Sequence, residues 1–361
     1  MAGQYTTTGT QNFYAGNYAA KWHRGAGNIA IGQQALYGNS TCADNTGGCN
    51  IALGHYAGKE NCSGTGNIFL GKQAGPTESA SSGGCNIIMG WDSGDKLTSG
   101  GKNIIMGHDS GRCITTASDN VFFGSSAGYE VSTNGNSVII GSGAGRFGNS
   151  LSNVFIGLGA GCGVTGCTPA ENAAVGCFSG RALTSGSLNA FLGGSSGCLV
   201  TSGTCDVVVG GKSGYSLTTG SQNTFLGAYG GYNATTGSHN VAIGFCVKLD
   251  SATGDKQLAI GCNTSYWISG DSSFNIEPGA GLKDKDGNLG TSGQVLSSTG
   301  TELDWIDVGG GSNLQTFTSS GTWSKPSSGN VAIVYMWGGG GGGGNGHTYK
   351  GGGGGGSYAQ F

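Results

Sequence analysis

The sequence has few charges, few prolines and no long apolar run. Lys, Arg, Asp and Glu make up 10% of the 361 residues, and the formal net charge is -3. So small a charge gives no basic surface for nucleic acid or anionic lipid, and we expect neither as a partner. No run of 18 apolar residues occurs, so we expect no membrane insertion. Four prolines without a Gly-x-y period exclude collagen.

The first residues also lack the pattern of a secretory signal. MAGQYTTTGTQNFYAG has no cationic segment followed by an apolar one. If the protein works outside a cell, release by lysis, as for part of a virion, fits this start.

What the sequence does have is glycine, 79 residues of it, in a repeat. A pattern of Asn-apolar-x-apolar-Gly recurs fifteen times, and nine of its fourteen intervals are 17 residues long. Such regularity is typical of a solenoid, in which each unit packs only on its neighbours. We therefore predict an all-β fold, a parallel β-solenoid of about fifteen 17-residue rungs. The anchor glycines are Gly16, Gly32, Gly54, Gly71, Gly90, Gly107, Gly124, Gly141, Gly157, Gly176, Gly193, Gly210, Gly227, Gly244 and Gly261.

The strand of each rung is apolar at three successive positions. By strand alternation, the two flanking residues share one face, and we expect them to fill the inside of the coil. The middle residue then points outward, which leaves an apolar stripe roughly 65 Å long at about 4.8 Å per rung. An obligate cyclic homo-oligomer, with this stripe as its interface, is the simplest way to cover it. The expected interface residues are Phe69, Ile88, Ile105, Phe122, Ile139, Phe155, Phe191, Val208 and Phe225.

Two further positions of the repeat fit a tight coil. The anchor Asn recurs where its amides can stack in a ladder, and its substitutes Ser137, Asp206 and Gln257 also form hydrogen bonds. After the anchor Gly, a small residue followed by Gly suits a cramped corner with positive φ.

The motif resembles the head repeat of trimeric autotransporter adhesins. NVAIG at 240–244 and NSVIIG at 136–141 nearly match the Asn-Ser-Val-Ala-Ile-Gly unit of those heads. The resemblance covers roughly residues 12–264 and implies a left-handed parallel β-roll that exists only as a homotrimer. The period here is longer than the usual adhesin head, which implies larger outer loops.

The segments that follow resemble parts of bacteriophage tail fibres. GTSGQVLSSTGTELDWID at 290–307 is similar to a connector of such fibres, and residues 316–344 resemble their glycine-rich tip domain. We therefore divide the chain into an N-terminal segment (1–11), a shaft (12–264), a connector (265–311) and a glycine-rich distal β domain (312–361).

The glycine runs at 338–344 and 351–356 have several interpretations. A phosphate-binding loop lacks the following Lys-Ser/Thr, and a disordered linker remains open. We favour extended glycine strands packed side by side. The residues between the runs, His347, Tyr349 and Lys350, are then candidates for receptor contact, although we favour their interpretation as ordinary exposed polar residues.

Twelve cysteines occur without any Cys-x-x-Cys, which disfavours structural zinc, and we expect no metal or cofactor. The shared spacing Cys-x6-Cys makes Cys42 with Cys49, and Cys198 with Cys205, candidate disulfides in outer loops, with free thiols as the alternative. Cys162 with Cys167 and Cys246 with Cys262 are further possible pairs.

No nucleophile, base and orienting group can be placed together, so we expect no enzyme. The sequence suggests a structural and adhesive trimeric fibre, foremost a phage tail fibre in an extracellular virion. Its expected partners are copies of itself, other tail or baseplate proteins, and a host surface glycan or protein. The alternatives are a bacterial cell-surface trimeric adhesin and an ice- or mineral-binding solenoid, which the scattered threonines disfavour.

Overall fold

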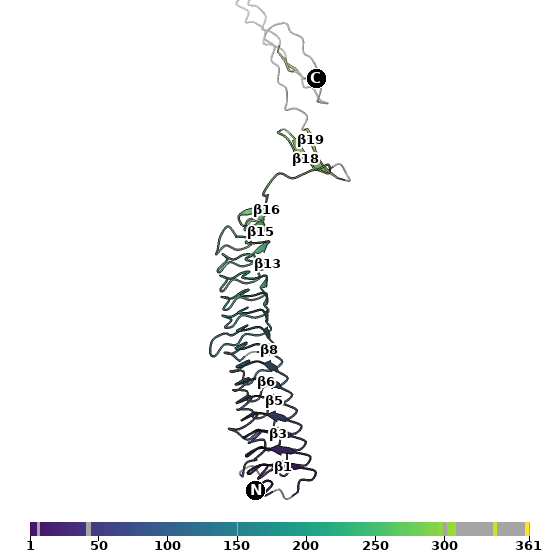
Figure 1. The fold of residues 1–361 in the computed structure, drawn as a ribbon. Helices are drawn as coiled ribbons and strands as arrows, with labels where there is room; N and C mark the ends of the chain where they lie inside the picture. Colours follow the sequence, from purple (N-terminus) through teal and green to yellow (C-terminus); the bar gives the residue numbers. More distant parts are fainter. Residues whose placement is uncertain are drawn as a thin grey trace, which may run out of the picture. The chain divides into compact units, whose positions relative to one another are not determined.

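A computed structural model describes residues 1–5, 8–40, 45–149, 151–292, 294–298, 302–307, 335–337 and 358–360. These residues form strands, turns and bends, and no helix occurs among them. The chain divides into two units, Met1–Gly279 and Ala280–Phe361. Figure 1 labels several strands of each unit, among them β1 of the first and β18 of the second.

The first unit is a parallel β-solenoid, as the repeat predicts. Fifteen short strands stack in chain order, each in register with the next, so that Ile105 pairs with Phe122 and Phe122 with Ile139. Every strand up to β14 has three residues because the anchor Gly ends it. The strands are β1 (Phe13–Ala15), β2 (Ile29–Ile31), β3 (Ile51–Leu53), β4 (Ile68–Leu70), β5 (Ile87–Met89), β6 (Ile104–Met106), β7 (Val121–Phe123), β8 (Val138–Ile140), β9 (Val154–Ile156), β10 (Ala173–Val175), β11 (Ala190–Leu192), β12 (Val207–Val209), β13 (Thr224–Leu226), β14 (Val241–Ile243) and β15 (Leu258–Cys262).

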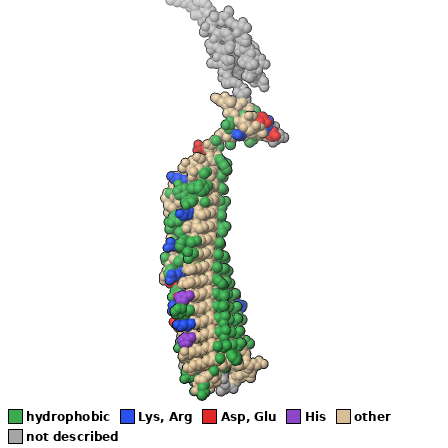
Figure 2. Space-filling model, viewed as in Figure 1, with side chains coloured by type: hydrophobic (Ala, Val, Ile, Leu, Met, Phe, Trp, Pro, Cys, Tyr) green, Lys and Arg blue, Asp and Glu red, His purple; other side chains and the backbone are tan. Residues whose placement is uncertain are grey.

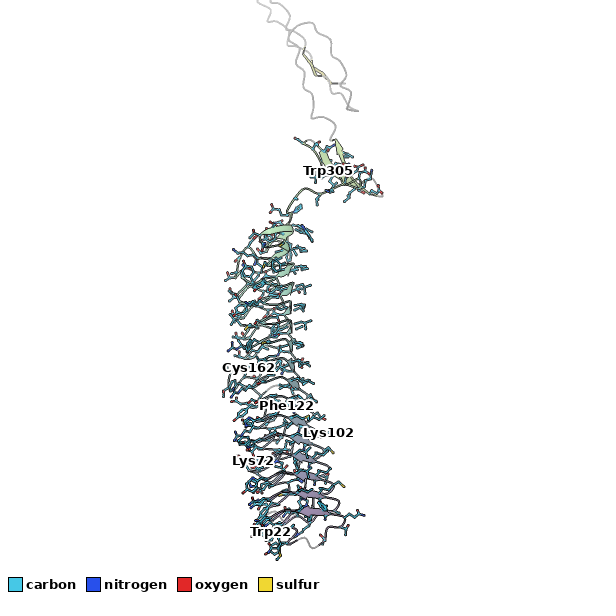
Figure 3. All side chains as sticks on the ribbon, viewed as in Figure 1. Trp22, Lys72, Lys102, Phe122, Cys162 and Trp305 are labelled. Atoms are coloured by element: carbon cyan, nitrogen blue, oxygen red, sulfur yellow. The ribbon has the colours of Figure 1, made fainter. Side chains whose placement is uncertain are left out.

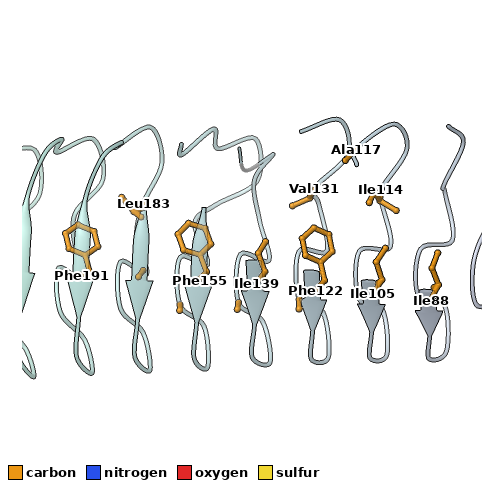
Figure 4. Close-up of a cluster of buried hydrophobic side chains, with 14 of the residues drawn as sticks. Ile88, Ile105, Ile114, Ala117, Phe122, Val131, Ile139, Phe155, Leu183 and Phe191 are labelled. Atoms are coloured by element: carbon orange, nitrogen blue, oxygen red, sulfur yellow. The ribbon is translucent and has the colours of Figure 1, made fainter. Parts of the chain in front are cut away.

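The middle residue of each triplet faces the inside of the coil, which reverses our expectation. Phe122 has no exposed surface in a single chain, and in Figure 4 its ring points from the strand toward Val131 on the return side of the rung. The expected trimer-interface residues are therefore core residues, so that part of the prediction is wrong: Phe69, Ile88, Ile105, Phe122, Ile139, Phe155, Phe191, Val208 and Phe225 are all buried. The physical reason is the packing inside the coil, where the corner glycine lies directly against the middle side chain: a Cβ on Gly128 would be 2.9 Å from the Phe122 ring.

Glycine makes the corners of the coil possible. Gly124 has φ +135°, and a Cβ on it would lie 2.7 Å from the carbonyl carbon of Gly141 in the next rung. Gly128 has φ +59°, and a Cβ there would lie 2.9 Å from the ring of Phe122. The backbone therefore approaches both the next rung and the core too closely for any side chain.

The anchor asparagines form the expected amide ladder. Asn103 Oδ1 accepts hydrogen bonds from the backbone N–H of Asn120 (3.1 Å) and from its Nδ2 (3.0 Å). Asn103 Nδ2 in turn donates to Asn86 Oδ1 (3.0 Å) and to the carbonyl oxygen of Ala117 (2.9 Å). Each buried amide thus satisfies polar groups of two rungs at once.

Two further strands cap the C-terminal end of this stack. β16 (Ser265–Gly270) pairs antiparallel with β15, and β17 (Ile276–Pro278) pairs antiparallel with β16, which completes a 17-stranded sheet. These residues fall in the segment that we assigned to the connector, but they belong to the first unit.

The second unit contains two antiparallel pairs among its described residues. β18 (Gln294–Ser298) pairs with β19 (Leu303–Asp307), and β20 (Tyr335–Trp337) pairs with β21 (Tyr358–Gln360). Trp305 Nε1 donates to the carbonyl oxygen of Leu282 at 3.1 Å, which ties β19 to the start of the unit.

Candidate functional site

The outward residues of the strand triplets form one continuous surface, which we call the apolar face. It holds the first and third residue of each strand from β1 to β14, together with Leu258 and Ile260 of β15. Of these thirty positions, Thr224 alone is polar, and none is charged. The exposed large side chains of this face are Phe13, Ile29, Ile31, Leu53, Ile104, Phe123, Val154, Leu192 and Val207.

The apolar face runs along the whole stack, as the hydrophobic column in Figure 2 shows. Fourteen steps of about 4.8 Å give a length of roughly 65 Å, and two side chains of one strand give a width of about 10 Å. The outline of roughly 650 Å² exceeds the largest apolar patch of most monomers, about 300–600 Å². It approaches the roughly 800 Å² that each partner contributes to a standard protein interface.

Strands β16 and β17, which follow the last rung, extend the apolar face and do not cover it. Ile268 of β16 pairs with Ile260, and Ile276 of β17 pairs with Gly270, so both continue the sheet beyond β15. Ile276 is 69% exposed. The apolar surface therefore does not end where the repeat ends.

The side of the coil away from the strands has a different chemistry, and we call it the outer face. It consists of the residues one, two and five positions after each anchor Gly. Figure 3 shows Lys72 of this face on the opposite side of the coil from the strands. Several of its aromatic rings are more than a third exposed: Tyr18, Trp91, Tyr215, Tyr229, Tyr232 and Phe245.

Cations of the outer face lie over aromatic rings. Lys72 Nζ is 4.6 Å from the ring centroid of Trp91, and the Arg181 guanidinium is 5.1 Å from that of Phe178. Near the start of the shaft, Lys21 Nζ lies within 6 Å of four aromatic rings, 4.9 Å from that of Tyr18. Such pairs contribute about 0.5–1 kcal/mol each at exposed sites and fix both side chains. The outer face thus presents aromatic rings held in place by neighbouring cations, and cations that already interact with a ring.

Carboxylates balance the cations in the middle rungs. Arg112 Nη1 lies 3.3 Å from Asp109 Oδ1, and His108 Nδ1 lies 3.2 Å from Asp109 Oδ2. Arg112 Nε lies 3.8 Å from the buried Asp95. Burial raises the pKa of Asp95, while its hydrogen bond with Thr77 acts in the opposite direction. This part of the outer face therefore has no strong charge of either sign.

Asp206 and His23 are titratable groups with no exposed surface. Burial raises the pKa of Asp206 to about 7 and lowers the pKa of His23 to about 4. The sequence indicated Asp206 only as a hydrogen-bonding substitute in the asparagine ladder, and His23 was not singled out. The sequence feature that could have identified both residues is a titratable side chain at a position of the repeat whose equivalents in other rungs are buried.

The predicted disulfides are wrong. Cys49, Cys198 and Cys205 carry free thiols, and Cys42 lies outside the described residues. Cys198 is buried and Cys205 exposed, because seven residues span only part of a 17-residue turn and place the two thiols on different sides. Cys162, Cys167, Cys246 and Cys262 are also free, whereas Cys62 is disulfide-bonded.

The candidate receptor-contact residues His347, Tyr349 and Lys350 lie outside the part of the chain that the structure describes. Within the described ranges, no group of three or more His, Cys, Asp or Glu side chains is arranged to hold a metal ion. The same ranges contain no helix with the length and apolar character needed to cross a bilayer. Comparison of the chain with known protein families, curated proteins and solved structures finds no match.

Proposed function

We propose that the protein is a structural and adhesive fibre whose solenoid shaft assembles as a homotrimer through the apolar face. The observation that carries this proposal is the uncharged apolar surface along all fifteen stacked strands. Exposing that surface to water is costly at about 25 cal/mol per Å² of apolar area, so covering it favours assembly.

Copies of the same chain are the partners that fit this surface. The apolar face repeats every 4.8 Å or so along the sheet, and a second copy offers the same repeat over the same length. A closed cyclic arrangement satisfies every copy with one surface. The number three follows the resemblance to the heads of trimeric adhesins.

A trimeric shaft supports adhesion through multivalency. Three outer faces and three distal domains on one rod bind a surface with far higher avidity than one copy, without strong single contacts. Exposed, rigid aromatic rings such as Trp91 and Tyr229 suit contacts with sugars or protein side chains, since they order little on binding. The partner that we propose is therefore a glycan or protein of a host surface.

The setting that we favour is a bacteriophage tail fibre, in which the shaft joins other tail or baseplate proteins. A bacterial cell-surface trimeric adhesin is the second candidate, supported by the Asn-apolar-x-apolar-Gly motif of the shaft. Neighbouring genes for tail or baseplate proteins decide for the virion, whereas a membrane anchor encoded in the same gene decides for the cell surface.

The direct test of assembly is the solution mass of the full chain by light scattering. Three times the chain mass of 35.7 kDa supports the proposal, and a well-folded monomer at micromolar concentration overturns it.

A charge placed on the apolar face locates the interface. Phe123→Glu and Leu192→Glu each bury a carboxylate between copies, and we expect the double variant to be a folded monomer. Ser125→Glu is the matched control, because Ser125 is exposed in the same rung as Phe123 but on the outer face. A double variant that stays trimeric, or a control that dissociates equally, contradicts the assignment.

A further inference from the structure

Asp206 occupies a position of the amide ladder that asparagine fills in most other rungs. It is fully buried, and its backbone N–H donates to Asn189 Oδ1 at 2.9 Å. Its Oδ1 accepts hydrogen bonds from the backbone N–H (2.8 Å) and Nδ2 (3.0 Å) of Asn223. One oxygen of the carboxyl group thus does what an asparagine oxygen does.

The other oxygen, Oδ2, stands where an asparagine has its NH₂ group. In neighbouring rungs that nitrogen donates two hydrogen bonds, one to the amide oxygen of the previous rung and one to a carbonyl 14 residues further along the chain. Asn189 Nδ2, for example, donates to Asn172 Oδ1 (3.0 Å) and to the carbonyl of Gly203 (2.8 Å). The equivalent carbonyl for Asp206 is that of Gly220. A Cβ on Gly203 would lie 2.5 Å from the oxygen of Gly220 and 2.8 Å from Asp206 Oδ2, so the two atoms face one gap.

This position requires a donor, and an ionised carboxylate has none. Asp206 Oδ2 is buried and has no hydrogen-bond partner. An ionised Asp206 directs an unsolvated negative charge at acceptor atoms, which is strongly unfavourable. A protonated Asp206 carries an O–H that replaces one N–H of the asparagine.

We propose that Asp206 is a proton-binding site within the shaft: its Oδ2–H donates to the Gly220 carbonyl, and loss of that proton destabilises the rungs built on β11, β12 and β13. The effect stays local because each rung of a solenoid packs only on its neighbours. The proposal does not depend on the trimer, since every contact that carries it lies within one chain.

The surroundings of Asp206 hold no other charged group. Asn189 lies on one side in the ladder and Asn223 on the other, and a Cβ on Gly203 would meet Gly220, Asp206 and the apolar Val200. Cys205, the preceding residue, is the nearest titratable side chain along the sequence, and it is exposed.

The pKa of Asp206 agrees with this geometry. Burial raises it from 3.8 to about 7, against the opposing effect of the hydrogen bonds from Asn223. Because the folded state holds the proton more tightly than the unfolded state, the stabilisation is complete below about pH 4 and is lost as the pH rises to about 7.

Asp206→Asn supplies the missing donor at every pH. We expect the melting temperature of this variant to equal that of the wild type near pH 4, and to exceed it by several degrees above pH 7. Hydrogen exchange should place the difference in peptides that cover residues 189–226. A difference that is the same at all pH values overturns the proposal.

Asn103→Asp reproduces the arrangement six rungs away, in a part of the ladder where Asn103 Nδ2 donates to Asn86 and Ala117. It should create a new loss of protection above neutral pH in β5, β6 and β7. Infrared difference spectra of the wild type against Asp206→Asn should contain the carbonyl stretch of a protonated acid at pH 5 and lose it at pH 9. Absence of that band at pH 5, or an Asn103→Asp variant without pH dependence, contradicts the proposal even if Asp206→Asn fails to fold.

Discussion

Phe122 and Phe123 are neighbours in β7, yet Phe122 has no exposed surface and Phe123 is 50% exposed. The same alternation holds along the stack, where a buried middle residue is flanked by outward ones in every strand from β2 to β15. Each strand thus serves two surfaces, the core of its own chain through one side chain and the apolar face through the other two.

Alanine substitutions should separate these two roles. Phe122→Ala leaves a cavity in the core, and we expect the local free energy of opening in β6, β7 and β8 to fall by about 3–5 kcal/mol at any protein concentration. Phe123→Ala should lower the melting temperature chiefly at high dilution, because it weakens association. Hydrogen exchange and melting over a concentration series measure both, and equal effects of the two variants would be inconsistent with the fold.

Glycine substitutions test the cramped corner. Gly128→Ala and Gly143→Ala both place alanine at positive φ, +59° and +64°, which costs about 1–2 kcal/mol. Gly128→Ala should cost about 1–3 kcal/mol more, because its Cβ meets the Phe122 ring, whereas a Cβ on Gly143 has nothing within 4 Å. The two local stabilities can be compared by hydrogen exchange, and a larger loss for Gly143→Ala would refute the packing described here.

Removing one amide from the ladder should open it locally. Asn103→Ala leaves the backbone N–H of Asn120 and the carbonyl of Ala117 without their side-chain partners, at about 1–3 kcal/mol for each. Asn103→Ser should be milder, since Ser137 fills the same position in β8's rung and its Oγ accepts from the N–H of Asn153 at 3.2 Å. Exchange rates of the amides of residues 117–121 report the difference, and identical rates in the two variants would argue against the ladder.

Lowering the pH should reduce the local stability of the N-terminal rungs, because the buried His23 becomes protonated. Burial lowers the pKa of this histidine from 6.5 to about 4, so the unfolded state binds its proton first. Stability contributed by the neutral ring is complete above pH 6.5 and decreases as the pH falls toward 4, by up to about 3 kcal/mol. Hydrogen exchange near residues 19–25 should show this loss, and His23→Asn should abolish it.

The matched control for that experiment is His108→Asn. His108 is half exposed, beside Asp109, so its replacement should leave the acid response of residues 19–25 unchanged. A wild-type protein whose first rungs are equally protected at pH 7 and pH 4 would contradict the buried, neutral state of His23.

Thiol labelling distinguishes the free cysteines. In the native protein, iodoacetamide should modify the exposed Cys49, Cys85, Cys177, Cys205 and Cys262 quickly. Cys198 should react slowly, because it is buried and burial raises the pKa of its thiol. Peptide mass spectrometry gives the rates. If Cys49 or Cys205 does not react with iodoacetamide, that result would support the disulfides that the Cys-x6-Cys spacing suggested.

The repeat alone was sufficient to predict the architecture. The spacing of the anchor Asn and Gly fixed the strand positions, the number of rungs and the in-register parallel stack. It could do so because each rung contacts only the next, so one local pattern determines every long-range pairing.

The repeat could not decide which side of the strand is the inside, because all three positions of the triplet are apolar. One signal was available in the variation of side-chain size. Middle residues vary in size from Ala to Phe, as in Ala52 and Phe69, and Leu36 and Phe69 both lie near Gly58, beside the rung whose strand residue is the small Ala52. Such compensation in volume is a property of a packed core.

Sulfur pairing and the state of Asp206 depend on three-dimensional detail that spacing does not contain. Cys198 and Cys205 are close in sequence but lie on different sides of one turn. For Asp206, the sequence indicates a hydrogen-bonding residue, whereas the acceptor atoms around its second oxygen are seen only in the folded coil.

Each anchor glycine lies against its equivalent one turn later, so the length of the shaft is restricted to whole numbers of turns. An insertion within a turn has to leave the coil as a side loop, because β9 and β10 stay in register across the longer, 19-residue interval from Gly157 to Gly176. Reach can therefore change only in steps of one complete repeat, and each step adds the same increment of length and the same pair of apolar side chains.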